Sequence, residues 1–305
     1  MKVGVNLINF GPSAEPKNLL GWARLAEGLG YHSLMTSDHV VTTEDVQARY
    51  PAPFYEPLST LGWLVGVTET IEIGTTVLIL PYRSPLETAR SFANLDQLSG
   101  GRVILGVGIG WAEQEFAALG VPFRRRGAMT NEYLDIIKTL WTNETASYQG
   151  EFVSFENART TPMPMRQPHP PIWVGGQSDA ALRRTVRYAD GWHPIRVRES
   201  WLRDKGIPAL QAVAEEEGKP TPAICPRIRL RITSTKAPDD DRLMGEGTID
   251  QIHHDMAALE AMGCEHVLFD TYYDDVEATR EPRTAWRMYS EVAEKVLDLP
   301  NQRVR

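Results

Sequence analysis

Histidine and aspartate side chains stand at two places where the sequence could support proton transfer. His39 directly follows Asp38 after a strand-like segment, and His193 lies in another such segment. Imidazole titrates near neutral pH, so either histidine could donate or accept a proton. We expect His39 to be the catalytic residue and His193 to lie in the substrate pocket. The alternative for His39 is a hydrogen-bonded side chain that only anchors a loop.

The same residues, together with Asp270 at the end of a further strand-like segment, could instead bind a metal ion. Metal sites are usually built from closely spaced His or Cys ligands. No such pair accompanies His39 or His193, and the first strand-like segment, VGVNLINF, contains no histidine. We therefore expect no metal site, and a metal-dependent hydrolase is kept only as an alternative.

Two glycine-rich turns could face a ligand. Gly175-Gly176-Gln177-Ser178 follows a strand-like segment and opens a helix, so its backbone N–H groups could bind a phosphate. Ser178 could equally be no more than the helix N-cap. The segment GVGIGW, which contains Gly108, could leave room for a flat ring, although it lacks the glycine spacing of a dinucleotide-binding turn. A tight loop without a ligand is the alternative there.

Strand-like and helix-like segments alternate through almost the whole chain. We predict strands over 3–7, 31–36, 71–80, 102–107, 171–174, 192–195, 228–232 and 266–270. We predict helices over 17–29, 84–98, 128–141, 179–188, 199–217, 248–262 and 282–297. This alternation predicts an α/β fold with a parallel sheet, closed as a (β/α)8 TIM barrel, rather than an open doubly wound sheet.

One irregular segment interrupts the alternation. It runs over 143–170, between the fourth and fifth units, and contains TTPMPMRQPHPP. Its prolines prohibit helix. We predict an extended insertion that covers the barrel mouth.

Length and composition suggest a single domain over residues 1–305. The net charge of −8 argues against nucleic acid as a partner. Only two cysteines occur, no leader segment is evident, and no apolar run is long enough to span a bilayer. We expect a cytoplasmic protein with no membrane partner.

Several ordered segments resemble the luciferase-like monooxygenase superfamily, and within it the branch that uses the deazaflavin coenzyme F420. They are Ser37-Asp38-His39-Val40, IEIGTTVLILPYR, GGRVILGVGIGW, PPIWVGGQSDAALRR and YADGWHP, and together they span nearly the full chain. The resemblance, rather than composition or spacing, is what names the cofactor.

The resemblance implies positions for that cofactor. A cis peptide at Thr76-Val77 would support the back of its ring, and Asp38 and His39 would lie near the ring edge. Contacts to the cofactor would also come from Gly108, and the turn formed by Gly175, Gly176, Gln177 and Ser178 would bind its phosphate. The family usually forms homodimers, so a homodimer is expected here.

The sequence departs from the resemblance at one position. Sugar-phosphate dehydrogenases of this branch carry an acidic residue after the GxGxG segment, where this chain has Trp111, with Glu115 further on. That difference suggests a more apolar substrate. We place Trp111, Glu115, Trp192 and His193 at the substrate pocket, although either tryptophan could simply pack beneath the loops.

The resulting functional hypothesis is an oxidoreductase that transfers a hydride between coenzyme F420 and a small organic substrate at the barrel mouth. The first alternative is a monooxygenase that uses oxygen and reduced FMN from a separate reductase. The second is a non-catalytic barrel that binds a flavin-type ligand.

Overall fold

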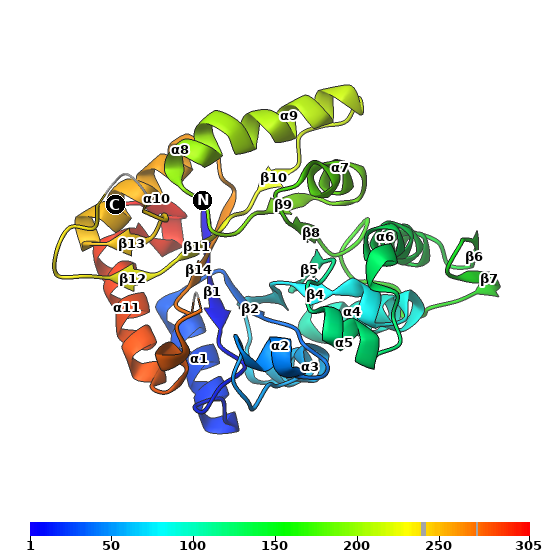
Figure 1. Cartoon of the computed structure of the whole chain (residues 1–305), viewed down its shortest axis with the longest axis horizontal. Helices are drawn as coiled ribbons and strands as arrows, with labels where there is room; N and C mark the ends of the chain where they lie inside the picture. Colours follow the sequence, from blue (N-terminus) through cyan, green and yellow to red (C-terminus); the bar gives the residue numbers. More distant parts are fainter. Residues whose placement is uncertain (239–241, 273) are drawn as a thin grey trace.

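A curled sheet of parallel strands forms the centre of the molecule, and helices lie outside it (Figure 1). The computed structural model describes residues 1–238, 242–272 and 274–305. The strands of the sheet are β1 Lys2–Leu7, β2 Ser33–Thr36, β3 Glu72–Thr75, β4 Leu78–Ile79, β5 Val103–Gly108, β8 Ile172–Gly175, β9 Gly191–His193, β10 Ala223–Ile224, β11 Arg227–Arg229 and β14 His266–Asp270. Their order is β10-β9-β8-β5-β3-β2-β1-β14-β11, with β4 also paired to β5.

The two ends of this order meet, because β10 and β11 are consecutive segments of one extended stretch. Its Cys225 N–H donates to the carbonyl oxygen of Trp192, and Arg227 forms a parallel bridge with Ile195. On its other side, β11 pairs with β14. The sheet therefore closes on itself, in agreement with the predicted α/β barrel.

The strands are buried on both faces, which is typical of a parallel sheet covered by helices. Val3, Val5 and Leu7 of β1 face the layer between the sheet and the helices. A smaller apolar cluster, formed by Met35, Ile104, Trp173, Cys225 and Leu268 from five other strands, is separate from that layer. Residues that alternate along each strand thus fill two cores.

The outer layer is formed by the helices that follow the strands. They are α1 Pro16–Leu29, α2 Glu44–Gln47, α3 Pro57–Val67, α4 Pro85–Ser99, α5 Glu113–Ala118, α6 Arg126–Thr142, α7 Asp179–Tyr188, α8 Glu199–Trp201, α9 Ile207–Glu216, α10 Ile249–Ala261 and α11 Pro282–Lys295. Gly30 ends α1 in the left-handed conformation that its sequence position predicts. In the described part of the chain, no helix combines the length and apolar character needed to cross a membrane.

Several elements differ from the prediction, such as the helix predicted over 199–217, which is divided into α8 and α9 by a π-helical segment, Leu202–Gly206. Helix α3 was not predicted, because its apolar residues and two glycines show little helical periodicity. The third predicted strand, 71–80, is divided into β3 and β4 around Thr76 and Val77. The peptide between these two residues is cis, as the family resemblance implied.

The segment over 143–170 does not cover the barrel mouth. Its first part is an antiparallel hairpin of β6 (Ala146–Gln149) and β7 (Ser154–Ala158), which projects beyond α6 at the right of Figure 1. Its proline-rich part lies at the amino ends of the strands, where Arg166 contacts Glu72 at the start of β3 at 2.6 Å. The prediction of a cover was wrong because α6 carries the chain back to the end of the barrel opposite the mouth.

Candidate active site

A cavity of about 280 Å³ lies at the carboxyl ends of the strands, where barrel enzymes place their active sites. Its lining comes from six strands and the loops after them: Ser37, Asp38, His39, Tyr50, Thr76, Val77, Ile79, Gly108, Ile109, Gly110, Trp111, Gly175, Gly176, His193, Ile195 and Arg227. Most of the residues predicted for the site are thereby brought together.

Larger cavities lie elsewhere among the described residues: one of about 320 Å³ is lined by residues such as Arg229, Leu230 and Met288, and two others are larger still. One of about 550 Å³ opens at the amino ends of the strands, near Lys2 and His266. The other, of about 830 Å³, lies between α8 and α10, and charged residues in its lining pair with one another, as Arg242 does with Asp255. We therefore build the candidate site at the carboxyl ends of the strands.

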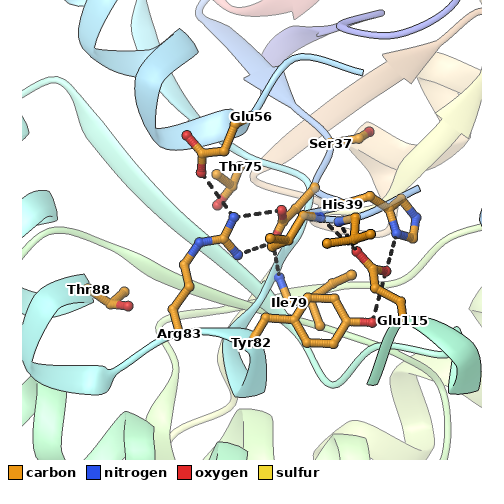
Figure 2. Close-up of polar contacts among 12 residues, drawn as sticks. Ser37, His39, Glu56, Thr75, Ile79, Tyr82, Arg83, Thr88 and Glu115 are labelled. Atoms are coloured by element: carbon orange, nitrogen blue, oxygen red, sulfur yellow. Dashed lines mark hydrogen bonds and ion pairs between the residues drawn. The ribbon is translucent and has the colours of Figure 1, made fainter. Parts of the chain in front are cut away.

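His39 is held rigidly in the loop after β2. The start of this loop is held by Asn9, whose side chain donates to the Ser37 carbonyl oxygen at 2.9 Å and accepts from the Ser37 N–H at 3.1 Å. The imidazole is nearly buried, and its Nδ1 lies 2.6 Å from Glu115 Oε2 (Figure 2). An ionised carboxylate only accepts hydrogen bonds, so Nδ1 carries the hydrogen atom and a neutral ring has its lone pair on Nε2.

Glu115, on α5, is completely buried and accepts four hydrogen bonds. Besides His39, its donors are the N–H groups of Val40 and Val41, at 2.7 and 3.0 Å, and the Tyr82 hydroxyl at 3.0 Å (Figure 2). Burial by itself would raise the pKa of Glu115, but hydrogen bonds from His39 and the two N–H groups outweigh it, and the pKa lies below its ordinary value. The carboxylate is thus ionised beside the imidazole.

Glu115 consequently does not line the cavity, which corrects its assignment to the substrate pocket. It lies behind His39 and orients the ring. The sequence contains a signal for this role. Glu115 lies in a short helix that follows the glycine-rich end of β5, and an acidic side chain there can reach back across the barrel mouth. The spacing alone could not identify its partner, which is 76 positions earlier.

Asp38 forms a second ionic contact, independent of His39. Its Oδ2 accepts from Arg83 Nη1 at 2.6 Å and from the Ile79 N–H at 2.8 Å, and its Oδ1 accepts from Arg83 Nη2 at 2.9 Å (Figure 2). Arg83 also contacts Glu56, which caps α3, at 3.0 Å. Asp38 lines the cavity, but its two oxygens already bind the segment after β4.

His193 lines the cavity but offers no free nitrogen to a ligand. Its Nε2 is 2.8 Å from Thr76 Oγ1, and its Nδ1 is 2.5 Å from the Cys225 carbonyl oxygen. Complete burial is the main reason that its pKa is lowered to about 4, and the nearby Arg227 also lowers it. The ring is therefore neutral at pH 7 and orients Thr76.

Arg227 is a site residue that the sequence did not reveal. Its Nη2 and Nε contact Asp270 Oδ2 at 2.7 and 3.1 Å, and its Nη1 donates to the Thr76 carbonyl oxygen at 2.6 Å. Asp270 also accepts from Asn6 Nδ2 at 2.8 Å. The alternating arginines of RIRLRI could have signalled an arginine inside the barrel, since charged residues seldom occupy a buried strand without a partner.

The two tryptophans have different locations. Trp111 lines the cavity, is 37% exposed, and packs edge-to-face against the His39 ring at 5.8 Å between ring centroids. Trp192 is completely buried in the layer outside the barrel, where its ring packs near Trp201 and its indole N–H donates to the Gly176 carbonyl oxygen at 2.8 Å. Its assignment to the substrate pocket was wrong, because adjacent strand residues face opposite sides and His193 faces the interior.

The turn between β8 and α7 has the properties of an anion site. Gly176 has a φ of +114°, which favours glycine. Ser178 caps α7 by accepting from the Ala181 N–H at 3.3 Å. Among the described residues, the Gln177 and Ser178 N–H groups have no hydrogen-bond acceptor. A β-carbon at Gly175 would make ordinary contacts at 3.4–3.7 Å with Val77, Val107 and His193, so no clash requires glycine there.

Gly108 has a different reason for being glycine. A β-carbon there would lie 2.5 Å from Val77 Cγ2, and one at Gly106 would lie 2.0 Å from the Thr75 carbonyl oxygen. These glycines are required by the close approach of β3 and β4 to β5. This packing accounts for both glycines; Gly108 also lines the cavity, and its contact with a flat ring stays a prediction.

Within the described residues, no group of three or more His, Cys, Asp or Glu side chains is arranged to hold a metal ion. The site instead combines a histidine–carboxylate pair, two buried ion pairs, an aromatic wall and a turn with free N–H groups. That combination suits an organic ligand with a planar portion and an anionic group.

The sequence as a whole matches a known family over residues 1–282, that of the luciferase-like monooxygenases. The chain belongs to this family, whose members are oxidoreductases or monooxygenases. An uncharacterized protein of Mycobacterium tuberculosis is 33% identical over 223 residues, which are 66% of this chain and 79% of that protein. The F420-dependent glucose-6-phosphate dehydrogenase of Amycolatopsis mediterranei is 29% identical over 237 residues, 74% of this chain and 68% of that protein.

A solved structure with the same fold comes from an FMN-containing enzyme. The oxygenating constituent of 3,6-diketocamphane monooxygenase of Pseudomonas putida, in complex with FMN, superimposes with a TM-score of 0.76 at 16% identity. The match covers 96% of this chain and 97% of that one. Among proteins similar in sequence, the FMNH2-dependent dimethylsulfone monooxygenase of Pseudomonas putida is 34% identical over 133 residues, 43% of this chain and 36% of that protein. Relatives of this chain thus include one that depends on F420 and one that depends on FMNH2.

Proposed function

We propose that this protein is an oxidoreductase that transfers a hydride between coenzyme F420 and a small organic substrate. The observation that carries this proposal is the His39–Glu115 pair at 2.6 Å, because His39 lines the same cavity as Gly175 and Gly176, which lead into the turn with unpaired N–H groups. The F420-dependent relative, which aligns with 74% of this chain, supports the choice of cofactor.

The residues present fit such a cofactor. The N–H groups of Gln177 and Ser178, at the N-terminus of α7, would hold its phosphate. Val77, Gly108 and Gly175, which line the cavity, would adjoin its flat ring. When bound, the deazaflavin supplies the carbon that donates or accepts the hydride.

His39 would move the accompanying proton. In the neutral ring, the Nε2 lone pair can accept the hydroxyl proton of an alcohol that is being oxidised. In the reverse direction, the protonated ring can donate that proton to a carbonyl oxygen. Glu115 stabilises the imidazolium in either direction, since its carboxylate is ionised and 2.6 Å from Nδ1. Thr76, oriented by His193 and Arg227, forms the adjacent polar wall.

A second candidate function is a monooxygenase that uses reduced FMN, which a separate reductase would supply. The FMN-bound enzyme with the same fold favours it, because FMN also carries a phosphate and a flat ring. In that case the same turn would bind the FMN phosphate. His39 would then transfer a proton during oxygen chemistry.

Fluorescence titration of the purified chain with F420, and in parallel with FMN, tests the proposal. Micromolar binding of F420 together with weaker FMN binding is the expected result. Preference for FMN, followed by oxygen uptake when reduced FMN is supplied, would replace the proposal with the monooxygenase. Tight binding without reduction of any compound in a broad alcohol and carbonyl panel would instead favour a binding protein.

A further inference from the structure

An arginine beside Trp111, in the wall of the cavity, has no ionic partner within the described residues. Arg49 follows α2 and is exposed, and its guanidinium lies over the Trp111 ring, 4.7 Å from the ring centroid. Among the described residues, no carboxylate forms an ion pair with Arg49 and no side chain accepts a hydrogen bond from its guanidinium. Stacking uses the face of the guanidinium and leaves its in-plane N–H groups free to bind a carboxylate through two hydrogen bonds.

A carboxylate that could pair with Arg49 is present but used elsewhere. Asp45 stands four positions before Arg49, the spacing at which helical ion pairs form. Its Oδ1 accepts instead from the Thr43 hydroxyl at 2.6 Å and from the Val46 N–H at 2.9 Å, and its Oδ2 accepts from the Gln114 N–H at 3.3 Å. The local structure therefore leaves the charge of Arg49 available.

The carboxylates beside the cavity already have partners. Asp38 pairs with Arg83, Asp270 pairs with Arg227, and Glu115 accepts four hydrogen bonds. A ligand that lies along the Trp111 wall therefore has the Arg49 guanidinium as the nearby cation that is not ion-paired within the described residues. An anionic group is the chemistry that such a wall favours.

We propose that Arg49 and Trp111 form a subsite for the carboxylate end of a planar substrate whose reacting carbon lies against His39. This inference rests on the proposed function and specifies its substrate class. The Arg49 guanidinium lies 4.7 Å and the His39 ring 5.8 Å from the Trp111 ring centroid, so we expect a planar substrate that lies along Trp111 to reach both groups. Tyr50, Ile109 and Ile195, which also line the cavity, favour an apolar body between the two groups.

Two probes that differ in one charge can test the subsite. 4-(Hydroxymethyl)benzoate and benzene-1,4-dimethanol share a benzylic alcohol and a ring, and only the first is anionic. Calorimetric titration of the full chain, without cofactor, should show the anionic probe binding about tenfold more tightly, as expected for a charge-assisted bidentate contact. Arg49→Gln should abolish this preference and leave the neutral probe unchanged, while Arg49→Lys should retain part of it.

The control is Arg90→Gln, since Arg90 is an exposed arginine on α4. It should leave the preference intact. The subsite is refuted if the intact chain shows no preference, or if Arg49→Gln weakens both probes equally. It is also refuted if Arg49→Gln weakens F420 binding and leaves both probes unchanged, because Arg49 would then contact the anionic tail of the cofactor. Since the probes are titrated without cofactor, failure of the chain to bind F420 would affect the proposed function alone.

Discussion

The contact between His39 and Glu115 joins two residues that are 76 positions apart. The carboxylate fixes which nitrogen of the ring faces the cavity and stabilises the protonated ring. Without this carboxylate, His39 would transfer protons less effectively, because a freely rotating imidazole could turn either ring nitrogen toward the substrate. Glu115 is thus a positioning residue that acts through His39.

Replacing Glu115 with Gln should test this role. The NH2 group of the glutamine side chain would face N–H and O–H groups that are themselves hydrogen-bond donors. The His39 ring should therefore lose its orientation. We expect turnover to fall about 100-fold, within the range for loss of general acid–base catalysis, with little change in cofactor affinity. The pH–rate profile should also change, which a purely structural defect would not produce.

Glu113→Gln is the matched control, because Glu113 is exposed and lies two residues away on the same helix. Turnover in this variant should match that of the unmodified protein. Equal losses of turnover in the two variants would show that turnover depends on the charge of α5 rather than on the contact between Glu115 and His39.

At the scale of elements, the turn before α7 combines a required glycine with unpaired N–H groups. Gly176→Ala would place a β-carbon 2.9 Å from Ala181 Cβ at a φ of +114°. We expect this variant to lose about 1–2 kcal/mol of stability and to bind the phosphate-bearing cofactor about tenfold more weakly. Chemical denaturation and cofactor titration measure the two effects.

Gly28→Ala provides the contrasting glycine. Gly28 lies inside α1, where an added β-carbon would meet no atom within 4 Å. This substitution should raise stability by about 0.5–1 kcal/mol and leave cofactor binding unchanged. Normal cofactor affinity in Gly176→Ala would contradict the phosphate role of the turn.

The ion pair of Asp38 and Arg83 connects the loop after β2 to the segment after β4. Asp38→Asn would leave the Arg83 guanidinium, whose side chain is only 13% exposed, with Glu56 as its remaining partner. We expect a loss of about 3 kcal/mol or more in the free energy of unfolding, since one partner of a buried pair is removed. Glu56→Gln should cost less than about 1 kcal/mol, because the Glu56 side chain is 39% exposed. Equal losses from the two substitutions would contradict this ranking.

At the scale of the whole molecule, neutral histidines buried in the barrel link stability to pH. The pKa of His193 is lowered by burial to about 4 from its ordinary 6.5. The unfolded chain therefore binds a proton at this position before the folded chain does. Its contribution to stability is complete above pH 6.5 and declines as the pH falls toward 4.

Comparison with His193→Gln isolates that contribution. The free-energy difference between the two proteins should shrink by about 2 kcal/mol between pH 7 and pH 5, measured by chemical denaturation. A difference that stays constant over this range would show that His193 does not enter the folded protein as a buried neutral ring.

Most of the fold could be predicted from local patterns. Strand and helix alternation indicated the parallel barrel, and Gly30 marked the end of α1. Helix α3 was not predicted because apolar side chains, such as Trp63 and Val67, also occupy its exposed positions, which weakens the periodicity that identifies a helix. The location predicted for the proline-rich segment was wrong. Its composition indicates an extended chain but does not indicate at which end of the barrel that chain lies.

The sequence by itself determined the order of elements, the family and the glycine turn, because these depend on neighbouring residues or on ordered motifs. Only the tertiary structure decided which side chains meet. It placed Glu115 behind His39, directed Trp192 out of the barrel, and brought Arg227 to Thr76 and Arg49 to Trp111. Trp192 and Arg227 lie on strands, where a one-residue change in register would turn each side chain to the opposite face. Glu115 and Arg49 meet their partners because a helix and a loop pack over the barrel mouth.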